Sequence, residues 1–192
     1  MKRFWILPLC LLLLLMCSGC GSKGNGGADI QAQYARVAAA QMEAEVTFHT
    51  GQEDRSFTLR CDYTPESSTV TVTAPETVAG ITATVSGDGL TIGYDGAMLS
   101  AGSGGLPGPV NALPYLLRAL GSGYLLEQGR ETLGDTDCYR LTLDAALGDT
   151  PLTCTAWLET ETLLPRYAEL AMEGTVVVSV ELLAFSCTLQ DN

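Results

Sequence analysis

Hydrophobic residues recur with a helical period where the globular part of the chain begins. The apolar residues at positions i, i+4, i+7 and i+8 are Ile30, Tyr34, Val37 and Ala38. This spacing places them on one face of an α-helix. The pattern predicts an amphipathic helix over residues 29–41, with Asp29 as its N-cap.

The period then changes to two, which is the signature of half-buried strands. Turn residues interrupt the alternation every eight to twelve residues, and Asp95-Gly96 is a tight hairpin signal. We therefore expect an antiparallel meander. Its six predicted strands cover residues 44–49, 57–63, 69–73, 81–86, 90–94 and 97–100.

A segment rich in Gly, Pro and Ser follows at residues 101–109 and predicts a loop. Because loops of this composition lie at the surface, it is a candidate lid or partner-contact element. A second helix begins after Asn111, has Pro114 in its first turn and ends at Gly121-Ser122-Gly123. Its apolar stripe consists of Leu113, Leu116, Leu117 and Leu120.

Four more strands are predicted after the second helix, at residues 139–143, 152–158, 167–172 and 175–185. Valines occupy both faces of the last strand, so we expect it to be covered on both sides. The fold class that follows is α+β. About ten antiparallel strands form a single curled sheet, an incomplete β-barrel, with two helices on its concave face.

The N-terminus has the layout of a secretory signal peptide. Lys2 and Arg3 precede an apolar run, which ends in Ser18-Gly19-Cys20. This ending resembles a bacterial lipobox, with Cys17 where that pattern prefers Leu. The alternatives are an ordinary signal peptide cut at another small residue, or an uncleaved anchor.

The lipobox interpretation divides the chain into three parts. Residues 1–19 are a lipoprotein signal peptide, residues 20–28 are the lipidated Cys20 and a flexible Gly-rich tether, and residues 29–192 are the folded domain. A palmitate-type acyl anchor would hold the protein to the membrane, at the outer face of the bacterial cytoplasmic membrane.

Charge excludes one class of partner. The 192-residue chain carries a formal charge of −12, and loss of the first 19 residues removes two bases and no acid. Phosphate backbones repel such an acidic surface, so we expect no nucleic acid as a partner. The length suits one domain.

The exported part of the chain keeps four cysteines, Cys61, Cys138, Cys154 and Cys187. Four cysteines allow three disulfide pairings, and buried free thiols are an equal alternative. None of these four cysteines lies in a CxxC motif, and the sequence has only one histidine, so we expect no metal site and no cofactor.

The single histidine, His49, stands at a strand end on the polar side of its strand. No GxSxG or similar motif supplies a nucleophile beside it, and the acidic pairs lie in turns or on solvent faces. The simplest interpretation is an exposed histidine, and the sequence predicts no enzyme.

Several segments together resemble one family of half-barrel proteins. They are "VTVTAPETVAGITATV", "LTIGYDGAML", "NALPYLLRAL" after the Gly/Pro loop, and "TAWLETETLLPRYAEL". With the lipobox and tether, their order is similar to LolA-type proteins, above all the lipid-anchored Firmicutes members, which include a germination lipoprotein. The resemblance implies an incomplete barrel around a largely apolar cavity, used by some members for acyl chains and by others for partner proteins.

Two functions follow from this resemblance and from the apolar stripe. The first is binding of a hydrophobic ligand, a lipid or lipopeptide acyl chain, in the half-barrel; the alternative is a non-enzymatic partner or scaffold for an envelope or spore-cortex enzyme. The same side chains could instead fill the core, and the sequence leaves that choice open. The candidate cavity residues are Phe57, Leu59, Val70, Val72, Ile92, Leu113, Leu116, Leu117, Leu120, Leu141 and Leu143.

Overall fold

A computed structural model describes residues 26–87, 89–103, 107–146 and 151–190 of the chain. Within these ranges eleven strands form one antiparallel sheet. The first half contains β1 (Val37–His49), β2 (Asp54–Tyr63), β3 (Ser67–Ala74), β4 (Thr82–Ser86), β5 (Gly89–Tyr94) and β6 (Ala97–Ser103). The second half contains β7 (Tyr124–Leu133), β8 (Thr136–Asp144), β9 (Leu152–Glu159), β10 (Pro165–Met172) and β11 (Thr175–Leu189).

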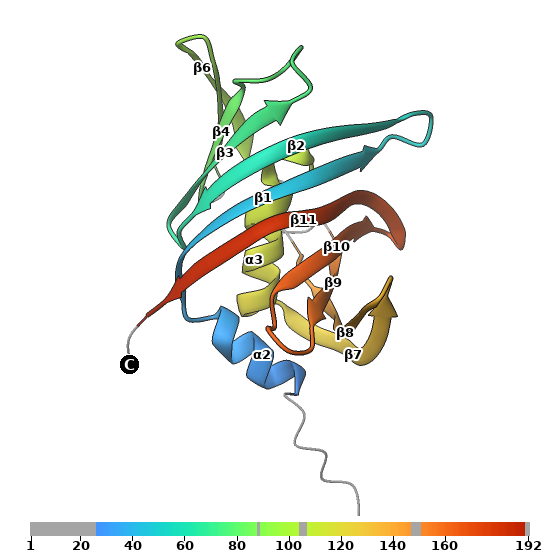
Figure 1. The fold of residues 1–192 in the computed structure, drawn as a ribbon. Helices are drawn as coiled ribbons and strands as arrows, with labels where there is room; N and C mark the ends of the chain where they lie inside the picture. The colour runs from blue at the N-terminus through green and yellow to red at the C-terminus, as the bar shows by residue number, and fades with distance from the viewer. Residues whose placement is uncertain (1–25, 88, 104–106, 147–150, 191–192) are drawn as a thin grey trace, which may run out of the picture.

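The sheet consists of two meanders joined in the middle. Its order is β6-β5-β4-β3-β2-β1-β11-β10-β9-β8-β7, so the first and last strands of the chain pair at the centre. The sheet curls without closing, and β6 and β7 are its two edges (Figure 1). This arrangement confirms the predicted single curled antiparallel sheet.

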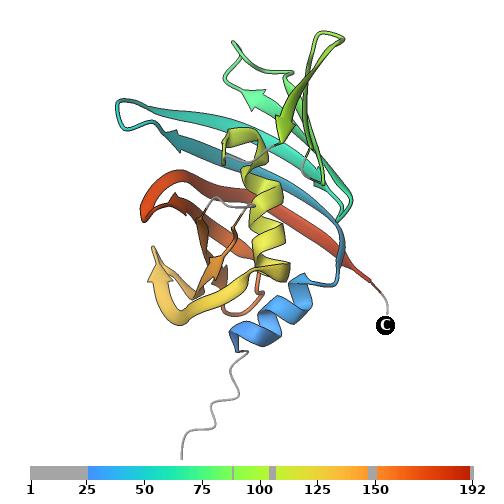
Figure 2. The same cartoon turned by 180° about the vertical axis from the view of Figure 1, so that it is seen from behind.

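Helix α3 (Ala112–Ser122) runs along the concave face of the sheet, and a short 3₁₀ turn, η2 (Pro109–Asn111), leads into it (Figure 2). The predicted start after Asn111 is confirmed, and the helix ends at Ser122, inside the predicted stop Gly121-Ser122-Gly123. Helix α2 (Gly27–Tyr34) packs across the C-terminal end of α3. At this crossing a Cβ on Gly121 would lie 3.2 Å from the carbonyl oxygen of Tyr34, so only glycine leaves room for the approach.

The prediction of a first helix over residues 29–41 is wrong at both ends. The helix begins at Gly27, inside the stretch assigned to the tether, and ends at Tyr34. From Val37 the chain is already strand β1, whose residues pair with β11 and β2. Pairing on two sides overrides the helical preference of the alanines at its start. Asp29 is not the N-cap; its carboxylate instead accepts a hydrogen bond from the N–H of Gly26 at 3.3 Å.

Three details of the strand prediction are also wrong. The sequence pattern does not predict strand β7, because most of this edge strand is exposed and it has no alternation of apolar and polar residues. Strand β6 continues through residues 101–103, which the prediction gave to the loop. Strand β11 is covered on one face only: Val178 and Val180 are fully buried, whereas Glu181 on the other face is exposed.

One core holds the domain together. It lies between α3 and the concave face and takes residues from both meanders and both helices, from Ile30 to Leu182. The described domain therefore contains its own complete core. The signal peptide (residues 1–19) and Cys20 lie outside the described residues, and no helix of the described ranges is long and apolar enough to cross a membrane.

Candidate functional site

The eleven predicted cavity residues come together on the concave side, where most of them are core. Nine are at most 4% exposed, and only Phe57 and Ile92 are half-buried. The nine buried residues are Leu59, Val70, Val72, Leu113, Leu116, Leu117, Leu120, Leu141 and Leu143.

Helix α3 is buried almost all round. Between Ala112 and Leu120 every residue is buried except Arg118. The helix contacts β1, β2, β8, β9 and β11, and η2 extends the cover to β3 and β4. Packing on this scale means that its leucines fill space between helix and sheet.

The helices cover less of the concave face at strands β5 and β6 than at the centre of the sheet. Val70, Ala83, Ile92 and Leu99 form one cross-strand row, because each is the register partner of the next. Opposed residues of antiparallel strands point to the same side, so the row runs along the concave face. Val70 and Ala83 are fully buried, Ile92 is half-buried and Leu99 is 68% exposed.

Two further apolar residues flank the end of this row on the same side. Leu90 and Tyr94 lie two positions before and after Ile92 on β5, which places them on its face of the sheet. Leu90 is half-buried and Tyr94 is 56% exposed. We call Leu90, Ile92, Tyr94 and Leu99 the β5–β6 shelf.

The strands that form and flank the shelf carry no charged residue. Between Glu76 and Arg118 the only charged residues are Asp88 and Asp95, and strands β4, β5 and β6 contain none. An exposed apolar surface on strands that carry no charged residue, in a chain of net charge −12, is typical of a binding surface.

A pocket of about 70 Å³ lies at the rim of the concave face. Its walls come from the β2–β3 turn, the β4–β5 turn and α3. Arg118 stacks on the ring of Tyr115, with its guanidinium carbon 5.0 Å from the ring centroid. Burial raises the pKa of the Tyr63 phenol in the same wall, and the charge of Arg118 opposes that rise. The pocket residues are Tyr63, Thr64, Pro65, Glu66, Ser67, Ser68, Val85, Gly87, Pro114, Tyr115 and Arg118.

A second, larger pocket of about 380 Å³ spans β2, β1 and β11. Four of its polar side chains pair with one another. Arg60 lies 3.8 Å from the carboxylate of Glu43, and Gln41 donates to Asp62 at 3.0 Å. This groove therefore offers little to a hydrophobic ligand in spite of its volume.

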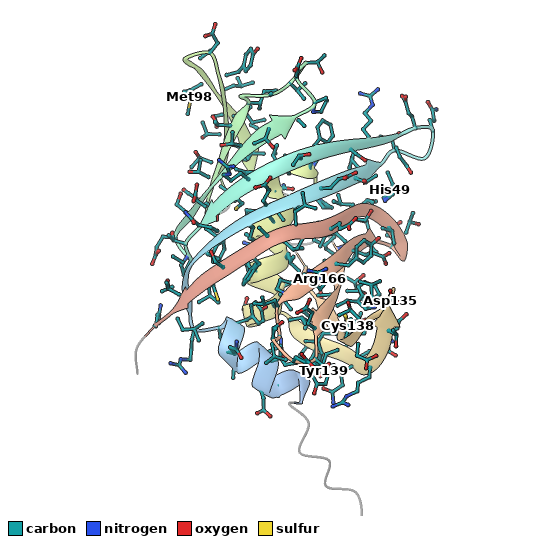
Figure 3. All side chains as sticks on the ribbon, in the orientation of Figure 1. His49, Met98, Asp135, Cys138, Tyr139 and Arg166 are labelled. Carbon is teal, nitrogen blue, oxygen red and sulfur yellow. The ribbon has the colours of Figure 1, made fainter. Side chains whose placement is uncertain are left out.

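His49 is not a simple exposed histidine, which corrects the prediction. It ends strand β1 beside β11 (Figure 3), and its side chain is only 29% exposed. The Nδ1 atom lies 3.0 Å from the carboxylate of Asp54, and Nε2 lies 2.8 Å from the hydroxyl of Ser179. Sequence reasoning missed this contact because Ser179 lies on a strand 130 residues away.

All four cysteines of the described domain are free thiols. Cys61, Cys138 and Cys154 are buried, and Cys187 is exposed. Burial raises the pKa of the Cys61 and Cys154 thiols to about 12, which keeps them protonated at neutral pH. Of the two alternatives from the sequence, buried thiols rather than bridges are present.

Sequence reasoning missed Leu99, Tyr63 and Arg118 as site residues. A signal for Leu99 was available: the two-residue turn Asp95-Gly96 pairs Ile92 with Leu99 by counting outward from the hairpin. No such local signal exists for the rim pocket, because three separate segments build it. The described residues include no group of three or more His, Cys, Asp or Glu side chains that could hold a metal ion.

Several solved structures have a fold similar to that of this chain. The structure of a DUF1329 family protein from Desulfovibrio piger matches at 13% identity with a TM-score of 0.52, over 86% of this chain and 93% of that one. An uncharacterized conserved protein from Thermus thermophilus matches at 10% identity with a TM-score of 0.50, over 84% and 85%. A LolA superfamily protein from Nitrosomonas europaea matches at 13% identity with a TM-score of 0.43, over 84% and 91%.

One structural neighbour is thus a LolA superfamily protein. At these identities the likeness is one of fold. No protein-family model and no curated protein sequence matches the chain.

Proposed function

We propose that this protein binds a hydrophobic ligand, a lipid or lipopeptide acyl chain, on the concave face of its half-barrel. The observation that carries the proposal is the gradient of exposure along one cross-strand row, from fully buried Val70 to Leu99 at 68%. The row leads from the core to solvent without a polar side chain. A ligand that continues the core along this row would contact apolar atoms throughout.

Burial of apolar surface supplies the driving force. Each methylene group removed from water contributes about 0.8 kcal/mol, so a chain lying on the shelf gains in proportion to its length. An acyl chain needs no hydrogen-bond partner, and the shelf offers none. The predicted cavity residues divide in this proposal. Half-buried Ile92 belongs to the shelf that contacts the ligand, half-buried Phe57 lies outside the shelf on β2, and the nine buried residues belong to the core.

The proposal also includes location. Lipidation of Cys20 would tether the domain to the outer face of the cytoplasmic membrane, where acyl chains are abundant. The net charge of the chain is strongly negative, so attachment through a basic patch is disfavoured and a covalent anchor would be needed.

A second candidate function is binding of an envelope protein, and one observation favours it. Edge strand β6 carries no charged residue and exposes Met98 at 67%, at the border of the sheet (Figure 3). The opposite edge, β7, carries Glu127, Arg130 and Glu131. Charges protect an edge from pairing with another chain, so β6 is the edge that an extended partner segment could join.

Binding of cis-parinaric acid, a fluorescent fatty acid, to the domain from residue 26 onward tests the first function. Leu99→Glu places a charge on the shelf and should weaken binding about tenfold or more. Leu183→Glu is the matched control, because this exposed leucine lies at a bulge of the central strand β11, away from the shelf. It should leave binding unchanged.

Equal binding by both variants would contradict the proposed site, and no binding by the unsubstituted domain would contradict the function. In that second case, a photo-crosslinking amino acid at position 98 tests the partner function in native cells. Capture of one specific envelope protein would favour it.

A further inference from the structure

The rim pocket places a positively charged side chain, Arg118, at the edge of the concave face of the sheet. Arg118 is the one exposed residue of α3 between Ala112 and Leu120, and it lies in the pocket wall. The remaining walls come from two turns of the first meander. Arg118 is thus the one basic residue that lines the pocket, and the helix supplies it; the strands and turns of the pocket wall contribute none.

The guanidinium of Arg118 has no carboxylate partner among the described residues within 4.0 Å. It stacks on the Tyr115 ring, a contact that orients the planar group. Stacking uses the face of a guanidinium and leaves N–H groups at its edge for an oxygen ligand. Burial raises the pKa of Tyr63, so this phenol in the same pocket stays protonated and can donate as well.

The pocket lies directly beside the apolar row on the same face. Tyr63, Ser68, Val85 and Leu90 form a cross-strand row of their own, because each is the register partner of the next. Ser68, Val85 and Leu90 each stand two residues along their strand from a member of the row that ends in Leu99. Two residues of strand span about 7 Å and return to the same face.

The pocket and the shelf therefore suit two parts of one ligand, a polar headgroup and an apolar chain. The pocket volume of about 70 Å³ is far below the roughly 300 Å³ at which sites for whole ligands begin. It fits a small headgroup. Leu90 connects the two features, because it belongs to the shelf and is the register partner of Val85, a residue of the pocket wall.

We propose that the rim pocket binds the anionic oxygen headgroup of an amphiphile, a carboxylate or phosphate, whose acyl chain lies on the β5–β6 shelf. Arg118 and Tyr63 donate to the headgroup, and Tyr115 orients Arg118. The inference rests on the proposed function and adds the charge class of the ligand. Glu66 lines the same pocket and would repel the headgroup, which sets the sign of one test below.

The test uses the full chain in membrane vesicles and measures covalent photolabelling. Three probes carry the same diazirine-bearing acyl chain: palmitic acid, hexadecanol and phosphatidylglycerol. Arg118→Ala should lower the apparent affinity for at least one anionic probe about tenfold, the typical effect of losing a charge-assisted hydrogen bond, and leave hexadecanol unchanged. Arg118→Lys should keep part of the affinity, and Glu66→Gln should raise it.

Arg55→Ala is the control for loss of an exposed arginine, since Arg55 stands at the start of β2 and outside the pocket. Loss of palmitic acid labelling alone assigns the pocket to free fatty acids, and loss of phosphatidylglycerol labelling assigns it to phospholipid. If Arg118→Ala affects no probe, or affects hexadecanol equally, the headgroup inference is wrong while the hydrophobic site stands. If no probe labels the chain, the proposed function itself fails.

Discussion

The Nε2 atom of His49 lies 2.8 Å from the Oγ atom of Ser179. Asp54 binds the other ring nitrogen, so the three side chains have the connectivity of a serine hydrolase triad. The rest of such a site is missing at this place. Ser179 pairs with Thr47 on one side and Glu169 on the other, so its backbone N–H belongs to the sheet ladder and cannot serve an oxyanion.

We therefore expect the contact to be structural, joining β1, β2 and β11. A fluorophosphonate probe, which labels activated serines, should not modify Ser179 in the native protein. Ser179→Ala should lower the free energy of unfolding by about 1 kcal/mol, measured by urea denaturation. Labelling at Ser179 that disappears in His49→Ala would show that the group is catalytic.

The buried thiols predict loss of stability in alkaline solution. Burial raises the pKa of Cys61 and Cys154 from 9.0 to about 12. Between these values the unfolded chain loses the two protons and the folded chain keeps them, so the free energy of unfolding should fall as the pH rises above 9. It should be unaffected by these groups below pH 9. Cys154→Ala should flatten this slope in urea titrations, and an unchanged slope would contradict the assignment.

The hydroxyl of Tyr34 donates to the carbonyl oxygen of Leu163 at 2.7 Å and ties α2 to the β9–β10 turn. Tyr34→Phe leaves a buried carbonyl without this donor, so the free energy of unfolding should fall by about 1–2 kcal/mol. Tyr94→Phe, at an exposed tyrosine, should have no such effect. The two urea denaturation curves are compared at neutral pH, and equal midpoints would show that the Tyr34 bond contributes nothing.

Lipidation at Cys20 predicts a covalent acyl group. Cells grown with an alkyne analogue of palmitate should produce a labelled protein in the membrane fraction, and Cys20→Ala should lose both the label and the processing of residues 1–19. Cys17→Ala is the matched control and should keep both. Persistent labelling of the Cys20→Ala variant would show that the acyl group is attached to another residue.

Most of the fold follows from the sequence because most strands are buried on one face only. Alternation at Val70 and Val72, or at Leu141 and Leu143, records that asymmetry directly. Strand β7 is not predicted for the opposite reason. Most of this edge strand is exposed, so its sequence shows no alternation of apolar and polar residues. The sequence pattern predicts too long a first helix, because the alanines at positions 38–40 are compatible with a helix or a strand. Pairing with β2 and β11 makes them part of a strand.

The site is less accessible to sequence reasoning than the fold. The candidate residues were selected for apolar character, and that property marks core as strongly as it marks a cavity. Leu113 and Leu120 are fully buried, whereas Leu99, the most exposed residue of the row, was not selected. Exposure depends on where α3 stops covering the sheet, which no local pattern encodes.

Organic extraction of the protein purified from its native membrane, followed by mass spectrometry, tests the central claim most directly. The unsubstituted protein and Leu183→Glu should carry the same noncovalently bound acyl lipid in comparable amounts, and Leu99→Glu should carry about tenfold less. Equal lipid in all three samples, or none in any of them, would contradict a hydrophobic site on the β5–β6 shelf.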